Sequence, residues 1–304
     1  MRCLLFSLIS LSALPTHGAE LPPPEHPLEL RDGERIALLG GTFIERMQSH
    51  GYLETLLTAA YPDRDLKFRN LGWSGDNVWG HSRAVFNTPD KGFDRLLRDL
   101  KLANPTLILV HYGENEAHAG QAGLELFRAG VNRLLDELKE AADSRVVLLG
   151  PRRHENLGEP LPNQDAYNAK LNQYNAALEK IAEERGLPYI NLNVVLPVDD
   201  RAPLTSNGLH LSASGYNKIA NRLAAQFTPG GDPPYDIFDS ERGKRLRRAI
   251  IEKNELFFHR HRPQNETYLF LFRKHEQGNN AVEVPQFDPL IESKEEEIAR
   301  LRKE

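Results

Sequence analysis

An uninterrupted apolar run near the middle of the chain, TLILVHY at Thr106–Tyr112, constrains the fold more than any other segment. A strand with one face in water alternates apolar and polar residues, and this run does not alternate. It is typical of a central parallel strand that helices cover on both faces. The chain is therefore expected to contain an α/β domain built on this strand.

Strand-like and helix-like patterns alternate along the sequence around this run. Further strands are expected at Arg35–Leu39, Leu66–Asn70, Arg145–Leu149 and Pro188–Leu192, and helices at Phe43–Tyr61, Gly123–Ala142, Asp165–Arg185 and Ser212–Gln226. This order predicts right-handed βαβ units and a three-layer α/β/α domain with a parallel sheet, over residues 35–228. Ligands of such sheets bind at the carboxyl ends of the strands, so a site is expected in the loops that follow them.

Residues 1–19 are expected to be a secretory signal peptide. A basic residue precedes the apolar run Cys3–Leu14, and small residues follow at Gly18 and Ala19, which is the order typical of such a peptide. We expect export, and no membrane span in the mature chain, which would begin with a lead at residues 20–34. Cys3 is the only cysteine of the chain, so the mature protein is expected to have no disulfide and no cysteine metal site.

Residues 229–304 form an appendage whose pattern differs from that of the main domain. It begins in the turn-rich PGGDPP and continues with a basic helix expected at Ser240–Phe258, a strand at Tyr268–Phe272 and a charged helix at Pro289–Glu304. The segment either packs on the main domain or docks a protein partner. A nucleic acid partner is not expected, because the chain has a net charge of −5 and shows no basic patch or stripe.

Polar residues capable of chemistry fall in four short segments at the ends of expected elements. They are GGT (Gly40–Thr42), SGDN (Ser74–Asn77), YGENE (Tyr112–Glu116) and SNGLH (Ser206–His210). Their order and positions resemble those of the SGNH (GDSL-type) hydrolases, a family of esterases and acyl hydrolases with a flavodoxin-like α/β fold. The resemblance covers roughly Arg35 to Gln226.

The resemblance implies a role for at least one residue in each segment. Thr42 takes the position of the nucleophilic serine and His210 that of the general base. The oxyanion hole would be formed by Gly75 and Asn115, and Asn207 takes the position of the acid that orients the base. The resemblance implies an ester substrate and acyl-enzyme chemistry, with no metal and no cofactor.

Two of these positions depart from the family pattern. Threonine supplies the same oxygen as serine, but its methyl group restricts χ1 and crowds the attack. Asn207 could accept the N–H of the histidine ring but cannot supply a charge; in serine proteases the corresponding change costs about four orders of magnitude in rate. Asp199, Asp200 and Glu114 are candidates for a substitute carboxylate.

Structural interpretations of the same residues remain open. TFIE (Thr42–Glu45) also matches a capping box, with threonine at the N-cap and glutamate at N3. Asn115 and His210 could be a turn residue and a structural histidine, and Ser74 suits a tight turn better than a nucleophile. Further candidate substrate contacts are Trp73, whose ring suits sugar stacking or the core, together with Asp76 and Glu114.

Two functions of different classes follow. The first is hydrolysis of esters, expected to be O-acyl or acetyl groups on carbohydrate; the alternative is a protein of the same fold that binds a glycan or a partner without hydrolysis. The tail segment Asn254–Gly278 resembles the tails of exported SGNH-like proteins from planctomycete and verrucomicrobial bacteria. That likeness implies a bacterial periplasm or an extracellular location.

Overall fold

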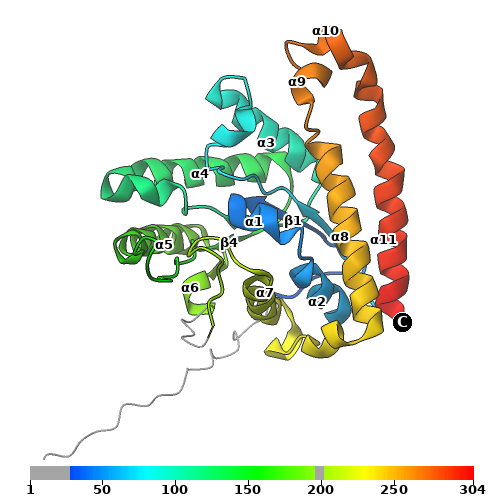
Figure 1. The fold of residues 1–304 in the computed structure, drawn as a ribbon, viewed down its shortest axis with the longest axis horizontal. Coiled ribbons are helices and arrows are strands. Elements are labelled where there is room, and N and C mark those ends of the chain that lie inside the picture. The colour runs from blue at the N-terminus through cyan, green and yellow to red at the C-terminus, as the bar shows by residue number, and fades with distance from the viewer. Residues whose placement is uncertain (1–27, 196–201) are drawn as a thin grey trace, which may run out of the picture.

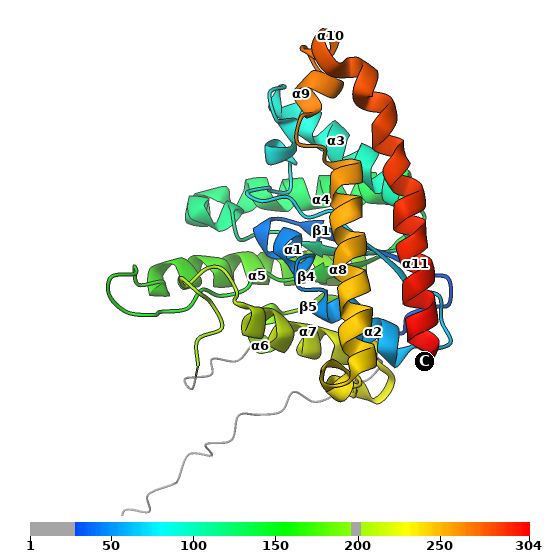
Figure 2. The same cartoon turned by 45° about the vertical axis from the view of Figure 1, so that its right-hand side comes forward.

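The computed structural model describes residues 28–195 and 202–304. The expected signal peptide, most of the expected lead, and the candidate carboxylates Asp199 and Asp200 lie outside the described residues. Figures 1 and 2 show a sheet between helices, with a long helical hairpin along one side.

A parallel five-stranded sheet forms the centre of the domain, in the order β2-β1-β3-β4-β5. The strands are β1 (Arg35–Gly40), β2 (Lys67–Asn70), β3 (Leu107–His111), β4 (Arg145–Leu149) and β5 (Tyr189–Ile190). All residues of β3 are buried, and this strand lies in the middle of the sheet, as its apolar run predicts. The expected α/β fold class is confirmed.

Helices cover both faces of the sheet because successive strand residues point to opposite sides. Leu38 and Leu109 belong to one core with α1 (Thr42–Met47), α2 (Tyr52–Ala60) and α7 (Ala213–Phe227). Leu39 and Val110 belong to the second core with α3 (Pro89–Ala103), α4 (Leu124–Ala141) and α5 (Asp165–Arg185). The remaining short elements of the domain are α6 (Leu192–Val195) and the 3-10 segments η1 (His81–Ala84) and η2 (Glu116–Gly123).

Two helical regions of the domain differ from the sequence expectation. The single helix expected at Phe43–Tyr61 is two helices, because Gly51 takes a left-handed conformation (φ +65°) between α1 and α2. Helix α3 was not expected from the sequence. It buries Phe93, Leu96 and Leu100 against the sheet at helical spacing.

The C-terminal segment forms a helical hairpin packed along the β2 edge of the sheet (Figures 1 and 2). After η3 (Pro229–Gly231) and η4 (Tyr235–Asp239) come α8 (Glu241–His261), α9 (Glu266–Leu269), α10 (Lys274–Gln277), η5 (Gly278–Gln286) and α11 (Phe287–Lys303). Helices α8 and α11 run antiparallel and share a small apolar core. The expected strand at Tyr268–Phe272 is wrong, because residues 266–269 form α9.

Buried ion pairs fasten this hairpin to the domain. Lys253 Nζ on α8 lies 2.6 Å from Glu54 Oε1 on α2 and donates to the Phe68 carbonyl on β2 across 3.1 Å. Arg69 on β2 pairs with Glu295 on α11. The hairpin thereby covers the edge strand β2. Of the two alternatives for residues 229–304, the structure shows packing on the main domain. Within the described ranges, no helix combines the length and apolar character needed to cross a membrane.

Candidate active site

The structure brings Thr42, Gly75 and Asn115 together at the carboxyl edge of the sheet. Thr42 Oγ1 accepts a hydrogen bond from the backbone N–H of Gly75, with 3.1 Å between the two atoms. Asn115 Nδ2 donates to the carbonyl of Asp76 across 2.5 Å and lies 3.7 Å from where a Cβ on Gly41 would be. Thr42 is half-buried, whereas Gly75 and Asn115 are exposed, so a ligand can reach this place.

Thr42 does not cap its helix. Gly41 is the N-cap of α1, and no side chain makes a capping hydrogen bond there. The Glu45 carboxylate, which a capping box would direct at Thr42, instead accepts the Ser74 N–H at 2.8 Å and the Ser74 hydroxyl at 2.6 Å. The capping-box interpretation is therefore wrong, and the Thr42 hydroxyl faces the loop that follows β2.

The loop after β2 lies directly on α1 because two of its residues are glycines. A Cβ at Gly72 would be 2.2 Å from the backbone nitrogen of Glu45, so only glycine permits this approach. Gly75 has φ +76°, the left-handed region that other residues enter only with strain. This backbone conformation turns the Gly75 N–H towards Thr42.

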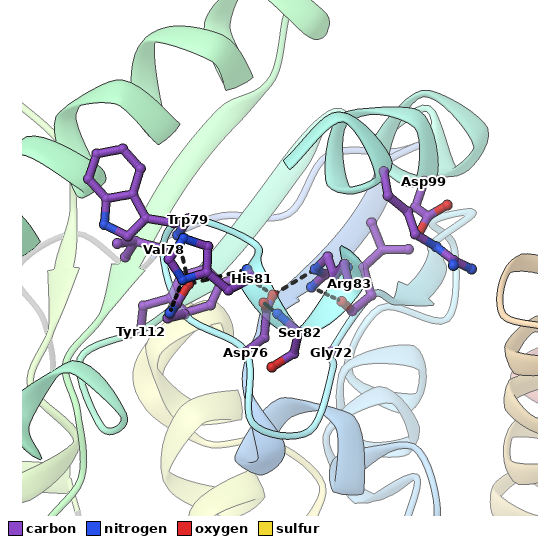
Figure 3. Close-up of polar contacts among 12 residues, drawn as sticks. Gly72, Asp76, Val78, Trp79, His81, Ser82, Arg83, Asp99 and Tyr112 are labelled. Carbon is purple, nitrogen blue, oxygen red and sulfur yellow. Dashed lines mark hydrogen bonds and ion pairs between the residues drawn. The ribbon is translucent and has the colours of Figure 1, made fainter. Parts of the chain in front are cut away.

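A buried ion pair anchors the same loop (Figure 3). Arg83 Nε lies 2.6 Å from Asp76 Oδ2, and both side chains are 0% exposed. The Tyr112 hydroxyl donates to the same carboxylate oxygen across 3.1 Å, and burial raises the pKa of Tyr112 far above its usual value. Asp76 was a candidate substrate contact, but its carboxylate cannot reach a substrate without breaking this pair.

Trp73, the other candidate contact in this loop, is buried among arginines. It is 5% exposed, and the guanidinium carbons of Arg262 and Arg95 lie 3.6 Å and 4.7 Å from the centre of an indole ring. The ring is thus covered by cations of the protein itself. The structure leaves it no open face for the sugar stacking considered from the sequence.

Glu116 joins the loops after β2 and β3, a role that the sequence did not indicate. Its carboxylate accepts the N–H of Val78 at 2.8 Å and the N–H of Gly113 at 2.9 Å. Burial raises the pKa of Glu116 to about 7, although these hydrogen bonds oppose the rise. The two loops that carry Gly75 and Asn115 are therefore held together through one buried carboxyl group.

His210 lies in the loop before α7, and the charge of Arg46 on α1 acts on its ring. Arg46 follows Thr42 by four residues and so lies on the same face of α1. Burial, then the positive charges of Arg46 and Arg152, lower the pKa of His210, while Glu114 opposes them. The ring is therefore neutral near pH 7, and within the described part of the chain it has no hydrogen-bond partner.

Asn207 shapes the backbone of this loop. Its Oδ1 accepts the N–H groups of His210 at 2.8 Å and Leu209 at 3.2 Å, as asparagine commonly does in turns. The resemblance implied that this oxygen orients the His210 ring, whereas the structure uses it for the loop backbone.

Glu114 is the one candidate for the missing acid that lies among the described residues, and Arg152 binds it. Arg152 Nε lies 3.1 Å from Glu114 Oε1, and the same guanidinium donates to the Leu209 carbonyl beside His210. His111 Nε2 lies 3.6 Å from Glu114 Oε1, and burial lowers the pKa of His111 to about 4. Glu114 thus acts on His210 through its charge. Arg152 was not singled out from the sequence, although it follows β4 at the edge where ligands are expected.

No metal site is formed by the described residues: nowhere in 28–195 or 202–304 do three or more His, Cys, Asp or Glu side chains gather in a way that could hold a metal ion.

One family of known proteins matches a large part of the sequence. The sequence profile of the GDSL-like Lipase/Acylhydrolase family matches residues 45–218, so the match begins just after Thr42. No curated protein matches the sequence.

Solved structures resemble the chain at low sequence identity. A putative GDSL-like lipase from Parabacteroides merdae has a TM-score of 0.52 and 15% identity, over 68% of this chain and 100% of that one. For the acetylxylan esterase Axe2 from Geobacillus stearothermophilus the TM-score is 0.49 and the identity 18%, over 66% and 96%. A gut microbial diltiazem-metabolizing enzyme gives 0.47 and 14% over 63% of this chain, which spans only 46% of that longer protein.

Because the family profile matches more than half of the sequence, the chain belongs to the GDSL-like lipase/acylhydrolase family.

Proposed function

We propose that the protein is an exported hydrolase that cleaves O-acyl or acetyl esters of carbohydrate, with Thr42 as its nucleophile. One observation carries the proposal: the Thr42 hydroxyl accepts the Gly75 N–H beside the Asn115 amide, in a place that a ligand can reach. A nucleophilic oxygen and two oxyanion donors are what acyl transfer requires.

In the proposed reaction the Thr42 oxygen attacks the ester carbonyl while its proton passes to neutral His210. The carbonyl oxygen becomes an oxyanion, held by the Gly75 N–H and by the second N–H of Asn115 Nδ2, whose first N–H remains on the Asp76 carbonyl. Each such donor typically contributes about 3–4 kcal/mol to lowering the barrier. The tetrahedral intermediate expels the alcohol, which takes the proton from His210. Water activated by His210 then releases the acid from Thr42.

Two features predict a slow enzyme. The threonine methyl group crowds the attack, and Asn207 is occupied by the loop backbone, so it does not stabilise the imidazolium. Among the described residues, Glu114 is the carboxylate whose charge favours protonated His210. Arg152 neutralises part of that charge. Export to a bacterial periplasm or the extracellular space, and the carbohydrate substrate, rest on the leader pattern and the family resemblance.

Hydrolysis of a small acetyl ester tests the proposal. The chain from Glu20 is compared with Thr42→Ala, Thr42→Ser and His210→Ala. We expect both alanine variants to lose the activity and the serine variant to exceed the wild type, because serine removes the crowding methyl group. Absence of activity in all four proteins would refute acetyl-ester hydrolysis through Thr42 and favour a binding protein of the same fold.

A further inference from the structure

The side chain of Arg262 connects the C-terminal hairpin to the active-site loop. Arg262 is the first residue after α8, and its guanidinium pairs with Glu45 on α1 and lies over the ring of Trp73 in the loop after β2. The side chains of Arg262 and Glu45 are 24% and 17% exposed, so the pair is largely shielded from water. Such a pair is less screened than a surface pair.

Glu45 also binds the loop after β2, which carries Gly75. Its two carboxylate oxygens accept the N–H and the hydroxyl of Ser74, and the next residue, Gly75, donates to Thr42. Although burial opposes it, the Ser74 hydrogen bonds and Arg262 hold the pKa of Glu45 below its usual value. Glu45 is therefore ionised near pH 7, which makes it a poor base for Ser74 and a strong acceptor for this loop.

A second set of contacts fixes the position of Arg262 itself. Arg95 on α3 donates to the carbonyl of His261 across 3.2 Å and pairs with Glu266 on α9. Its guanidinium also lies over Trp73. The backbone of Trp73 is tied to β1, since its N–H donates to the Gly40 carbonyl at 2.9 Å. The loop after β2 is thus held between α1, α3 and the residue that follows α8.

We propose that Arg262 is a positioning residue for the oxyanion hole, so that residues 229–304 are part of the active-site architecture. By holding Glu45 and Trp73, Arg262 fixes the loop that presents the Gly75 N–H. The catalytic consequence rests on the proposed ester hydrolysis, whereas the fixing of the loop does not.

Amide hydrogen exchange in the full chain tests the loop directly. Arg262→Ala is expected to speed exchange at residues 72–78 while leaving β3, at Leu107–His111, protected. Arg260→Ala is the matched control, because Arg260 pairs with Asp288 inside the hairpin and is expected to leave loop exchange unchanged. Arg262→Lys keeps the charge but loses the planar contact with Trp73, so it should give intermediate exchange.

Unchanged loop exchange in Arg262→Ala would overturn the proposal, as would an equal increase in Arg260→Ala. Should Arg262→Ala fail to fold, Arg262→Lys against Arg260→Ala decides the same comparison.

Kinetics on the acetyl ester test the catalytic part. We expect Arg262→Ala to lower kcat by about 10- to 100-fold, the cost typical of a displaced catalytic group, with little change in KM and partial rescue in Arg262→Lys. A wild-type kcat in Arg262→Ala would overturn the positioning role. An inactive wild type would instead count against the proposed function alone, since the exchange comparison still decides whether Arg262 fixes the loop.

Discussion

The backbone N–H of Gly75 donates to the hydroxyl oxygen of Thr42 across 3.1 Å, joining the loop after β2 to the first residue of α1, which lies 33 residues earlier in the sequence. This bond places a donor beside the oxygen that the proposed reaction uses. As Thr42 bonds to the substrate carbonyl carbon, the same N–H can turn to the neighbouring oxyanion without a change in the fold. The donor is useful only while the left-handed backbone of Gly75 is kept.

Gly75→Ala should therefore lower both stability and activity. A left-handed residue with a Cβ costs about 1–2 kcal/mol, and space is not the limit, because the nearest atom to the new Cβ is Ser82 Oγ at 3.5 Å. Gly33→Ala is the matched control: Gly33 has φ +72°, with nothing within 4 Å of a Cβ. Thermal unfolding should show similar losses in both variants, while ester hydrolysis falls in Gly75→Ala alone. Full activity in Gly75→Ala would argue against the oxyanion role.

Asp76→Asn should destabilise the protein strongly. The change leaves the fully buried Arg83 guanidinium without its counter-charge, and breaking one side of a buried ion pair typically costs about 3–5 kcal/mol. Asp94→Asn is the control, because the Lys91–Asp94 pair is exposed and such pairs contribute at most about 1 kcal/mol. Chemical denaturation measures both. Equal small losses would show that the Asp76–Arg83 pair does not anchor the loop.

The sheet could be predicted from the sequence because burial on both faces leaves a local signature. Residues 107–110 of β3 are all apolar and every position of the strand is buried, and the order of strand and helix patterns indicates the rest of the sheet. The four site segments could be found because each lies close to the end or the start of such an element. By contrast, α3 has a glycine in its interior, which weakens the helical pattern of its sequence.

The parts of the site that could not be predicted depend on contacts between distant residues. Whether Trp73 is open to a sugar is decided by Arg95 and Arg262, which belong to α3 and to the end of α8. Arg262 and Glu45 are 217 residues apart, so no local pattern connects them. The capping-box interpretation of residues 42–45 was wrong for the same reason, because the Glu45 carboxylate accepts hydrogen bonds from Ser74 in the loop after β2.

Glu116 predicts a pH dependence of stability. Burial raises its pKa from 4.5 to about 7 in the folded protein, so the folded state holds a proton that the unfolded state has lost between these two values. This contribution is fully present below pH 4.5 and is lost as the pH rises towards 7. Glu116→Gln should therefore flatten the fall in unfolding free energy between pH 5 and about 7.

Glu54 provides an internal reference for that measurement. Burial also raises the pKa of Glu54 to about 7, and its contribution remains in both proteins, so the difference between wild type and Glu116→Gln isolates Glu116. Denaturation at a series of pH values gives that difference. Parallel curves for the two proteins would contradict the raised pKa of Glu116.

The position of His210 beside α1 is tested by its own titration. Burial, followed by the charges of Arg46 and Arg152, lowers the pKa of His210 below 6.5. Arg46→Gln removes a positive charge that disfavours the imidazolium, so the pKa should rise, as NMR titration of the ring C–H can show without any enzyme activity. Arg153→Gln is the control, because Arg153 is exposed and is not among the charges that act on His210.

If hydrolysis depends on neutral His210, the acidic limb of kcat/KM should move to higher pH by the same amount in Arg46→Gln. An unshifted His210 pKa would place the ring away from Arg46, and hence away from the face of α1 that presents Thr42.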